Sequence, residues 1–219
     1  LREAVPKAFS STLDGVSRTT AIVRSLKEFS HPSSKERVPT DLNHSLQTTL
    51  DVARSEYKYA ADVDLSLGEI PAVPCFQGEI NQVLLNIIVN AAHAMTDVLD
   101  KTGQRGRLAI TTRADDDHVV VTIGDTGGGI PESIRESVYD PFFTTKPVGK
   151  GTGQGLAIAR RIVVEKHGGR LDFAVEEGIG TTFEIRLPLR PAQEEPGMTE
   201  GSRANGPADG LESAGVVGA

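Results

Sequence analysis

The sequence predicts an α+β sandwich, in which helices cover one side of a single mixed β-sheet. Two hairpin patterns predict the sheet: residues 106–114 and 118–125 alternate apolar and polar positions around an acidic turn, and residues 169–177 and 181–189 do so around a Gly-Ile-Gly turn. Residues 81–95 predict the helical layer, because they are as apolar as a buried helix. A chain of 219 residues with 38% hydrophobic content is sufficient for one sizeable core.

The first elements along the chain are a helix and a linker. Apolar residues recur at three- and four-residue steps over residues 7–29, which predicts a helix with one apolar stripe and therefore a partner helix. Pro32 and Pro39 bracket the polar stretch that follows. We interpret residues 32–40 as a linker and residue 41 as the start of the next unit.

The next unit begins with a helix and a strand. Asp41 or Asn43 has the side chain of an N-cap, and the helix is expected to reach about Tyr59. Residues 62–67 then alternate as a short strand before two prolines.

The C-terminal half contains one more helix and a tail. Residues 153–167 are expected to form a helix that Gly168 and Gly169 end. Residues 191–219 consist mainly of Pro, Gly, Ala, Ser and Glu and have almost no large apolar residue. They cannot form a core, so we expect a disordered tail.

Bulk properties exclude some partners. The chain has 23 basic and 30 acidic residues and a net charge of -7, which argues against nucleic acid. Cys75 is the single cysteine and cannot form an intrachain disulfide, which favours a reducing, cytoplasmic setting. No apolar run approaches the roughly 20 residues that span a bilayer, so no membrane contact is expected. The chain starts at Leu1, and we expect further sequence upstream.

A ladder of polar side chains runs through the apolar helix. Gln82, Asn86, Asn90 and His93 recur at steps of four, four and three residues, so they share one helix face. Amides inside a buried helix either cap neighbouring backbone groups or serve a site. For Gln82 both interpretations stay open.

Glycine clusters follow one strand and precede one helix. "DTGGGIP" comes after the strand over residues 118–125, and "GTGQGLAI" opens the helix over residues 153–167. These are places where the backbone can approach a ligand closely, although either cluster alone is more often an ordinary loop.

Taken in order, four segments resemble the N, G1, F and G2 boxes of the ATP-binding domain of sensor histidine kinases, in the superfamily that includes gyrase and the heat-shock chaperones. They are "NQVLLNIIVNAA", "DTGGGIP", "DPFFTTK" and "GTGQGLAI", and "GTTFEIRLP" resembles the closing strand. The resemblance implies the two-layer Bergerat ATP-binding fold for residues 41–190. Residues 1–31 resemble the second helix of the kinase dimerisation hairpin, which implies a homodimer.

The resemblance also implies a nucleotide site. Asn90 would give its amide oxygen to Mg²⁺, with Asn86 supporting the metal or its waters. Asp125 would accept a hydrogen bond from the adenine amine, which selects ATP over GTP, and Thr182 would add a direct or water-mediated contact, unless it is an ordinary strand threonine. The residues implied to bind ATP are Asn86, Asn90, Asp125, Gly127, Gly129, Lys146, Lys150, Gly151, Thr152, Gly153, Gly155, Leu156 and Thr182.

The stretch between the F and G2 boxes has the composition of a mobile lid over the nucleotide. Lys146 and Lys150 could contact phosphate there or could simply be solvated. Phe142 and Phe143 are expected at a hinge and in core packing, not stacked on the base.

Two positions depart from the family pattern. His93 occupies a position where many members have Lys or Arg to hold phosphate, and a partly exposed histidine at a helix end is the alternative interpretation. Gln154 replaces a usual Leu or Met, which we expect to tune packing only.

The reaction implied is phosphoryl transfer to histidine. The gyrase branch places a glutamate base at the position of Asn86, and an amide cannot take up a proton, so fast hydrolysis is disfavoured. None of the five histidines has the setting of the family's phosphoacceptor, so we expect it on a helix upstream or on a partner chain. A response regulator receiver domain would then be a partner.

Two alternatives stay open. One is a non-catalytic ATP-binding and dimerisation module that regulates a partner. The other is a serine-directed kinase of the anti-sigma type, which shares these boxes but not the preceding helix.

Overall fold

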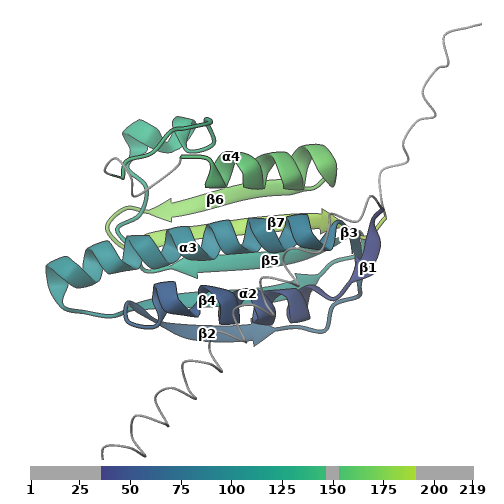
Figure 1. Ribbon diagram of the computed structural model, residues 1–219, viewed down its shortest axis with the longest axis horizontal. Coiled ribbons are helices and arrows are strands. Elements are labelled where there is room, and N and C mark those ends of the chain that lie inside the picture. The colour runs from purple at the N-terminus through teal and green to yellow at the C-terminus, as the bar shows by residue number, and fades with distance from the viewer. Residues whose placement is uncertain (1–35, 147–152, 191–219) are drawn as a thin grey trace, which may run out of the picture.

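The computed structural model describes residues 36–146 and 153–190, which form a mixed sheet with helices on one face (Figure 1). Within these residues the main sheet has five strands in the order β2-β4-β5-β7-β6. The first pair is parallel and the other neighbours are antiparallel, as a mixed sheet requires. The strands are β2 (Ala61–Leu67), β4 (Gly106–Ala114), β5 (His118–Asp125), β6 (Arg170–Glu176) and β7 (Gly180–Pro188).

Three helices lie side by side over the same face of this sheet (Figure 1). α3 (Gln77–Thr102) lies in the middle, with α2 (Leu42–Tyr57) on one side and α4 (Gly155–Arg160) on the other. α4 continues as the π-helical turn η2 (Arg161–Lys166), so the helix predicted over residues 153–167 is present but changes its hydrogen-bond pattern halfway. The predicted sandwich is therefore confirmed.

α2 starts where the sequence predicts, at Asp41. The Asp41 side chain accepts a hydrogen bond of 3.0 Å from the backbone N–H of His44, which is the N-cap arrangement. Asn43, the other candidate, lies inside the helix and bridges two strand ends: it donates to Gly68 O and accepts from the Thr112 hydroxyl. Asp41 is the cap.

α3 is the core helix of the domain. By length and composition alone, it is long and apolar enough to cross a membrane. However, it packs against the sheet between two helices (Figure 1), and many of its apolar side chains belong to the buried core. Its buried residues are Ile80, Asn81, Val83, Leu84, Ile87, Ile88, Ala91, Ala92 and Met95.

His167 connects the start of α3 to the end of η2. The backbone N–H of Phe76, just before α3, donates to His167 Nε2 at 3.0 Å, and Nδ1 lies 2.7 Å from the carbonyl of Ile162. Nε2 must therefore accept and Nδ1 must donate, which is possible only for the neutral ring. Burial of this side chain, which is 2% exposed, lowers the pKa of His167 and keeps it neutral.

Two short strands were not predicted. β1 (Val38–Thr40) pairs antiparallel with β3 (Val73–Cys75), so the last residues of the expected linker belong to a strand. Pro39 faces Pro74 in this ribbon. Proline usually marks a break, and three residues are too few for an alternating pattern, so these strands have no recognisable sequence signal.

The remaining expectations lie partly outside the described residues. The helix over residues 7–29 and the tail over residues 191–219 fall there. The structure also contains a 3₁₀ turn, η1 (Glu132–Ser137), within the segment between the G1 and F boxes.

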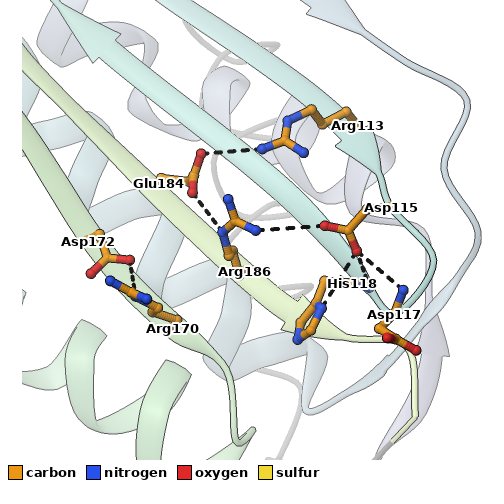
Figure 2. A network of polar contacts seen from close by, with 8 residues as sticks. All are labelled: Arg113, Asp115, Asp117, His118, Arg170, Asp172, Glu184 and Arg186. Atoms are coloured by element: carbon orange, nitrogen blue, oxygen red, sulfur yellow. Dashed lines mark hydrogen bonds and ion pairs between the residues drawn. The ribbon is translucent and has the colours of Figure 1, made fainter.

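The other face of the sheet carries charged side chains that pair with one another (Figure 2). Arg186 on β7 contacts Glu184 at 2.7 Å and Asp115 at 3.7 Å, and Arg113 on β4 contacts the same glutamate at 3.5 Å. These pairs are partly exposed, so each contributes little to stability. These charged side chains keep this face of the sheet hydrated. The hydrophobic core lies on the other side, between the sheet and the helices.

Candidate functional site

One face of α3 brings the four predicted segments together. The Asn86 amide donates to the carbonyl of Gly155 at 3.0 Å, which joins α3 to the start of α4. One turn later, Lys146 Nζ donates a long hydrogen bond of 3.4 Å to Asn90 Oδ1. One further turn along, Ala94 lies against Gly127, where an added Cβ would be only 2.6 Å from the Ala94 Cβ. The four segments therefore meet at the face of α3 that carries Asn86, Asn90 and Ala94.

Asp125 ends β5 on the helix-covered face of the sheet. Its Oδ1 accepts a hydrogen bond of 2.8 Å from Gly127 N, and the backbone N–H of Thr181 also donates to the carboxylate. Burial outweighs both bonds and raises the pKa of Asp125 from 3.8 to about 6. A buried carboxylate of this kind gains from any further donor, such as an amine on a bound ring.

The glycines after β5 are required by their surroundings. Gly127 has no room for a side chain under α3, and Gly129 has φ +74° with an added Cβ only 3.0 Å from Glu176 O. Gly153 has φ +64°, and a Cβ there would lie 2.4 Å from the Phe142 backbone. Only glycine fits these three positions without strain.

The expected contact from Thr182 is wrong, because this residue lies on the other face of the sheet. In the pairing of β5 with β7, Thr182 is opposite Gly124 and Thr181 is opposite Asp125. Successive side chains of a strand point to opposite faces. Thr181 is 5% exposed on the helical side, so it is the threonine that accompanies Asp125.

Phe142 also differs from its expected role in packing. Its side chain is 72% exposed, and it is the non-glycine residue with a positive φ, +68°, in the described part of the chain. A tight turn, in which Phe143 N donates to Asp140 O at 3.2 Å, forces this conformation. Phe143 is only partly buried.

His93 contacts the lysine of the F segment. Lys146 Nζ lies 2.6 Å from His93 Nδ1, and His93 Nε2 lies 3.5 Å from a carboxylate oxygen of Glu56 on α2. Burial, and then the charge of Lys146, lower the pKa of His93; burial also lowers the pKa of Lys146. Gln82, at the start of the ladder, is exposed and makes no part of this arrangement.

The other predicted residues are placed as follows. Gly155 lies directly beside Asn86, and Leu156 is half-buried against the core. Gln154 is exposed just before α4. Lys150, Gly151 and Thr152 lie outside the described residues.

The residues present fit ATP and Mg²⁺. Asp125 and the glycines beside it can hold adenine, and the amide oxygen of Asn90 is the kind of ligand that Mg²⁺ takes. Among residues 36–146 and 153–190 there is no group of three His, Cys, Asp or Glu that could hold a metal alone. In such a site Asn90 would be a ligand of Mg²⁺, an ion that takes oxygen ligands and normally keeps several waters.

Comparison with known proteins finds histidine kinases among the relatives of this chain. The chain is similar to the sensor histidine kinase ZraS of Escherichia coli K12, with 34% identity over 184 residues, 82% of this chain and 37% of ZraS. It is also similar to the signal transduction histidine-protein kinase AtoS of the same strain, with 32% identity over 188 residues, 83% of this chain and 29% of AtoS. The chain thus spans about a third of the length of these relatives.

Solved structures give the same answer for the fold. The catalytic domain of histidine kinase ThkA matches with a TM-score of 0.59 and 30% identity, over 69% of this chain and 97% of that domain. ThkA in complex with the response regulator protein TrrA matches with a TM-score of 0.58 and 27% identity, over 86% of this chain and 52% of that chain. Residues 77–191 match the family described as histidine kinase-, DNA gyrase B-, and HSP90-like ATPase. The predicted fold class is confirmed, and the chain belongs to this ATPase family.

Proposed function

We propose that this chain is the ATP-binding catalytic part of a two-component sensor histidine kinase, which transfers the γ-phosphoryl of ATP to a histidine on a dimerisation helix. The observation that carries the proposal is the single face of α3. Its Asn86, Asn90 and Ala94 contact the G2, F and G1 segments in turn. This arrangement supports a nucleotide site beside one helix, with Asp125 assigned to adenine and the amides of Asn86 and Asn90 assigned to a metal.

Each residue has a role in this proposal. The Asp125 carboxylate accepts a hydrogen bond from the adenine amine, and Thr181 beside it lines the same end of the site. Asn90, supported by Asn86, would hold Mg²⁺, which would neutralise phosphate charge. Lys146 donates a hydrogen bond to Asn90 and is assigned to the phosphates.

Transfer is favoured over hydrolysis. The Asn86 amide cannot act as a general base, and its NH₂ group is engaged by the Gly155 carbonyl. In the transfer, a histidine ring nitrogen forms the bond to the γ-phosphorus while the bond to the leaving ADP oxygen breaks. Positioning and charge stabilisation are then the contributions of this domain.

The partners belong to the proposal as well. ThkA has been solved with the response regulator protein TrrA, and we assign a receiver domain of this kind to the present chain. Residues 1–31, which lie outside the described residues, are assigned to the second helix of a homodimeric hairpin, and the phosphoacceptor histidine to a helix upstream or on a partner chain. ATP and response regulators are cytoplasmic, so this part of the kinase is assigned to the cytoplasm.

Phosphorylation assays test the reaction. The chain is incubated with γ-³²P-ATP and Mg²⁺, alone and with the upstream hairpin helix restored. We expect acid-labile label on the restored protein only. Label that never appears, despite ATP binding, would support the non-catalytic module, and acid-stable phosphoserine on a partner would support the anti-sigma type of kinase.

Asn90→Ala tests the metal assignment. We expect this change to weaken ATP binding about fivefold to tenfold with Mg²⁺ present, the equivalent of one interaction of about 1 kcal/mol. With EDTA in place of the metal, the variant and the wild type should bind alike. Gln82→Ala is the matched control, because Gln82 is an exposed amide two turns earlier on the same helix face. Equal losses with and without metal would remove Asn90 from the metal site.

A further inference from the structure

The ammonium group of Lys146 is held in place by a histidine. Lys146 Nζ lies 2.6 Å from His93 Nδ1 and 3.4 Å from Asn90 Oδ1, so one cation lies between two residues of α3 that are one turn apart. We propose that His93 is a positioning residue for ATP, which holds Lys146 where it meets the phosphates. This inference rests on the proposed function and adds a residue that the nucleotide need not touch.

The contacts of His93 determine which of its ring nitrogens carries the proton. An ammonium group has only donors, so Nδ1 of His93 has to accept and the proton has to lie on Nε2. That N–H faces Glu56, whose carboxylate oxygen is 3.5 Å away. Lysine, histidine and glutamate therefore form a polar chain that links the F segment to α3 and α3 to α2.

Two opposing influences act on the protonation of the ring. Burial and then the charge of Lys146 lower the pKa of His93, and they outweigh Glu56 on α2 and Asp97 on α3, which raise it. Asp97 also favours the charged form of Lys146. A protonated ring would place a second cation 2.6 Å from the ammonium group, so the neutral ring is the form that keeps Lys146 in position.

Holding a lysine matters because its side chain is flexible. A free lysine loses rotamer freedom when it binds phosphate, whereas an anchored one has already lost it. His93 should therefore improve the affinity for phosphates without affecting the affinity for the base. This difference separates positioning from a merely structural role.

A double-mutant cycle measures the coupling. Wild type, His93→Ala, Lys146→Ala and the double variant are titrated with a fluorescent ATP analogue, and adenosine is added as a competitor. We expect Lys146→Ala to weaken ATP binding about tenfold and His93→Ala about threefold to tenfold, the size of one hydrogen bond to a charged group in a half-exposed site. In the Lys146→Ala background, His93→Ala should have no further effect. Adenosine should bind all four proteins alike.

Two further variants complete the design. His93→Asn retains an acceptor near the position of Nδ1 and should recover most of the affinity for ATP. His44→Ala removes an exposed histidine on α2 and should bind as the wild type does. The inference is overturned if His93→Ala binds ATP as tightly as the wild type, if its effect persists without Lys146, or if adenosine binding falls in parallel. A wild type that binds neither ATP nor adenosine overturns the proposed function instead.

Discussion

Asp125→Asn is expected to remove most nucleotide binding while the fold persists. The asparagine oxygen can keep the hydrogen bond from Gly127 N, but the NH₂ group then faces the adenine amine, so two donors meet. The loss of a charge-assisted hydrogen bond in a buried site amounts to about 1 to 3 kcal/mol, or roughly fivefold to 150-fold in affinity. Titration with a fluorescent ATP analogue at pH 8 measures it. Unchanged affinity would remove Asp125 from the adenine site.

The same carboxyl group predicts how binding depends on pH. Burial raises the pKa of Asp125 to about 6, and only the ionised form can accept the adenine hydrogen bond with its full charge. Affinity for ATP should therefore fall as pH decreases through 6, by up to about tenfold per pH unit. The Asn variant should lack this slope, which serves as its control.

The free energy of unfolding should rise as pH decreases through this range, whereas the affinity for ATP should fall. The folded-state pKa of Asp125 is above the unfolded value of 3.8, so the folded state binds the proton more tightly. The contribution of this group to the free energy of unfolding is full below pH 4 and is lost as pH rises through 6, by about 3 kcal/mol at most. The difference between wild type and Asp125→Asn in urea unfolding isolates this contribution from that of other groups.

Gly180→Ala is expected to destabilise the fold strongly. A Cβ at this position would lie 1.9 Å from the carbonyl oxygen of Asp125 and 2.9 Å from its carbonyl carbon, so β5 and β7 would have to separate next to the site. Backbone cannot yield as a flexible side chain can, and we expect a loss of about 3 kcal/mol or more in the free energy of unfolding. Equilibrium urea unfolding measures it.

Gly128→Ala is the matched control for this change. It lies in the loop after Asp125, and a Cβ there would have nothing within 4 Å. Its unfolding midpoint should match that of the wild type. If Gly180→Ala and Gly128→Ala unfolded at the same urea concentration, the close contact between β7 and the end of β5 would be wrong.

Long periodic segments were predictable, and short or bent ones were not. β4 and β5 follow their alternating pattern to the residue, since one face is buried and the acidic turn fixes the hairpin. β1 and β3 are too short and too rich in proline to show a pattern. The π-helical turn after α4 depends on tertiary packing, which a helical periodicity does not reveal.

The alternation of β7 identifies the threonine that lies beside Asp125. Phe183, Ile185 and Leu187 define the buried face of β7, and counting back by two reaches Thr181, not Thr182. The contact of Lys146 with His93 had no such signal. It joins residues 53 positions apart and depends on the path of an irregular segment, which no local pattern determines.

The burial of Cys75 makes this protein convenient for site-specific labelling. Its thiol, at the end of β3, is the only one in the sequence, is fully covered, and has a pKa raised by burial, so it is a poor nucleophile toward maleimides. A cysteine introduced at Thr111, an exposed position on the charged face of the sheet, would then react with a maleimide dye while Cys75 would not. Such a dye would sit across the sheet from the nucleotide and leave the helical layer untouched.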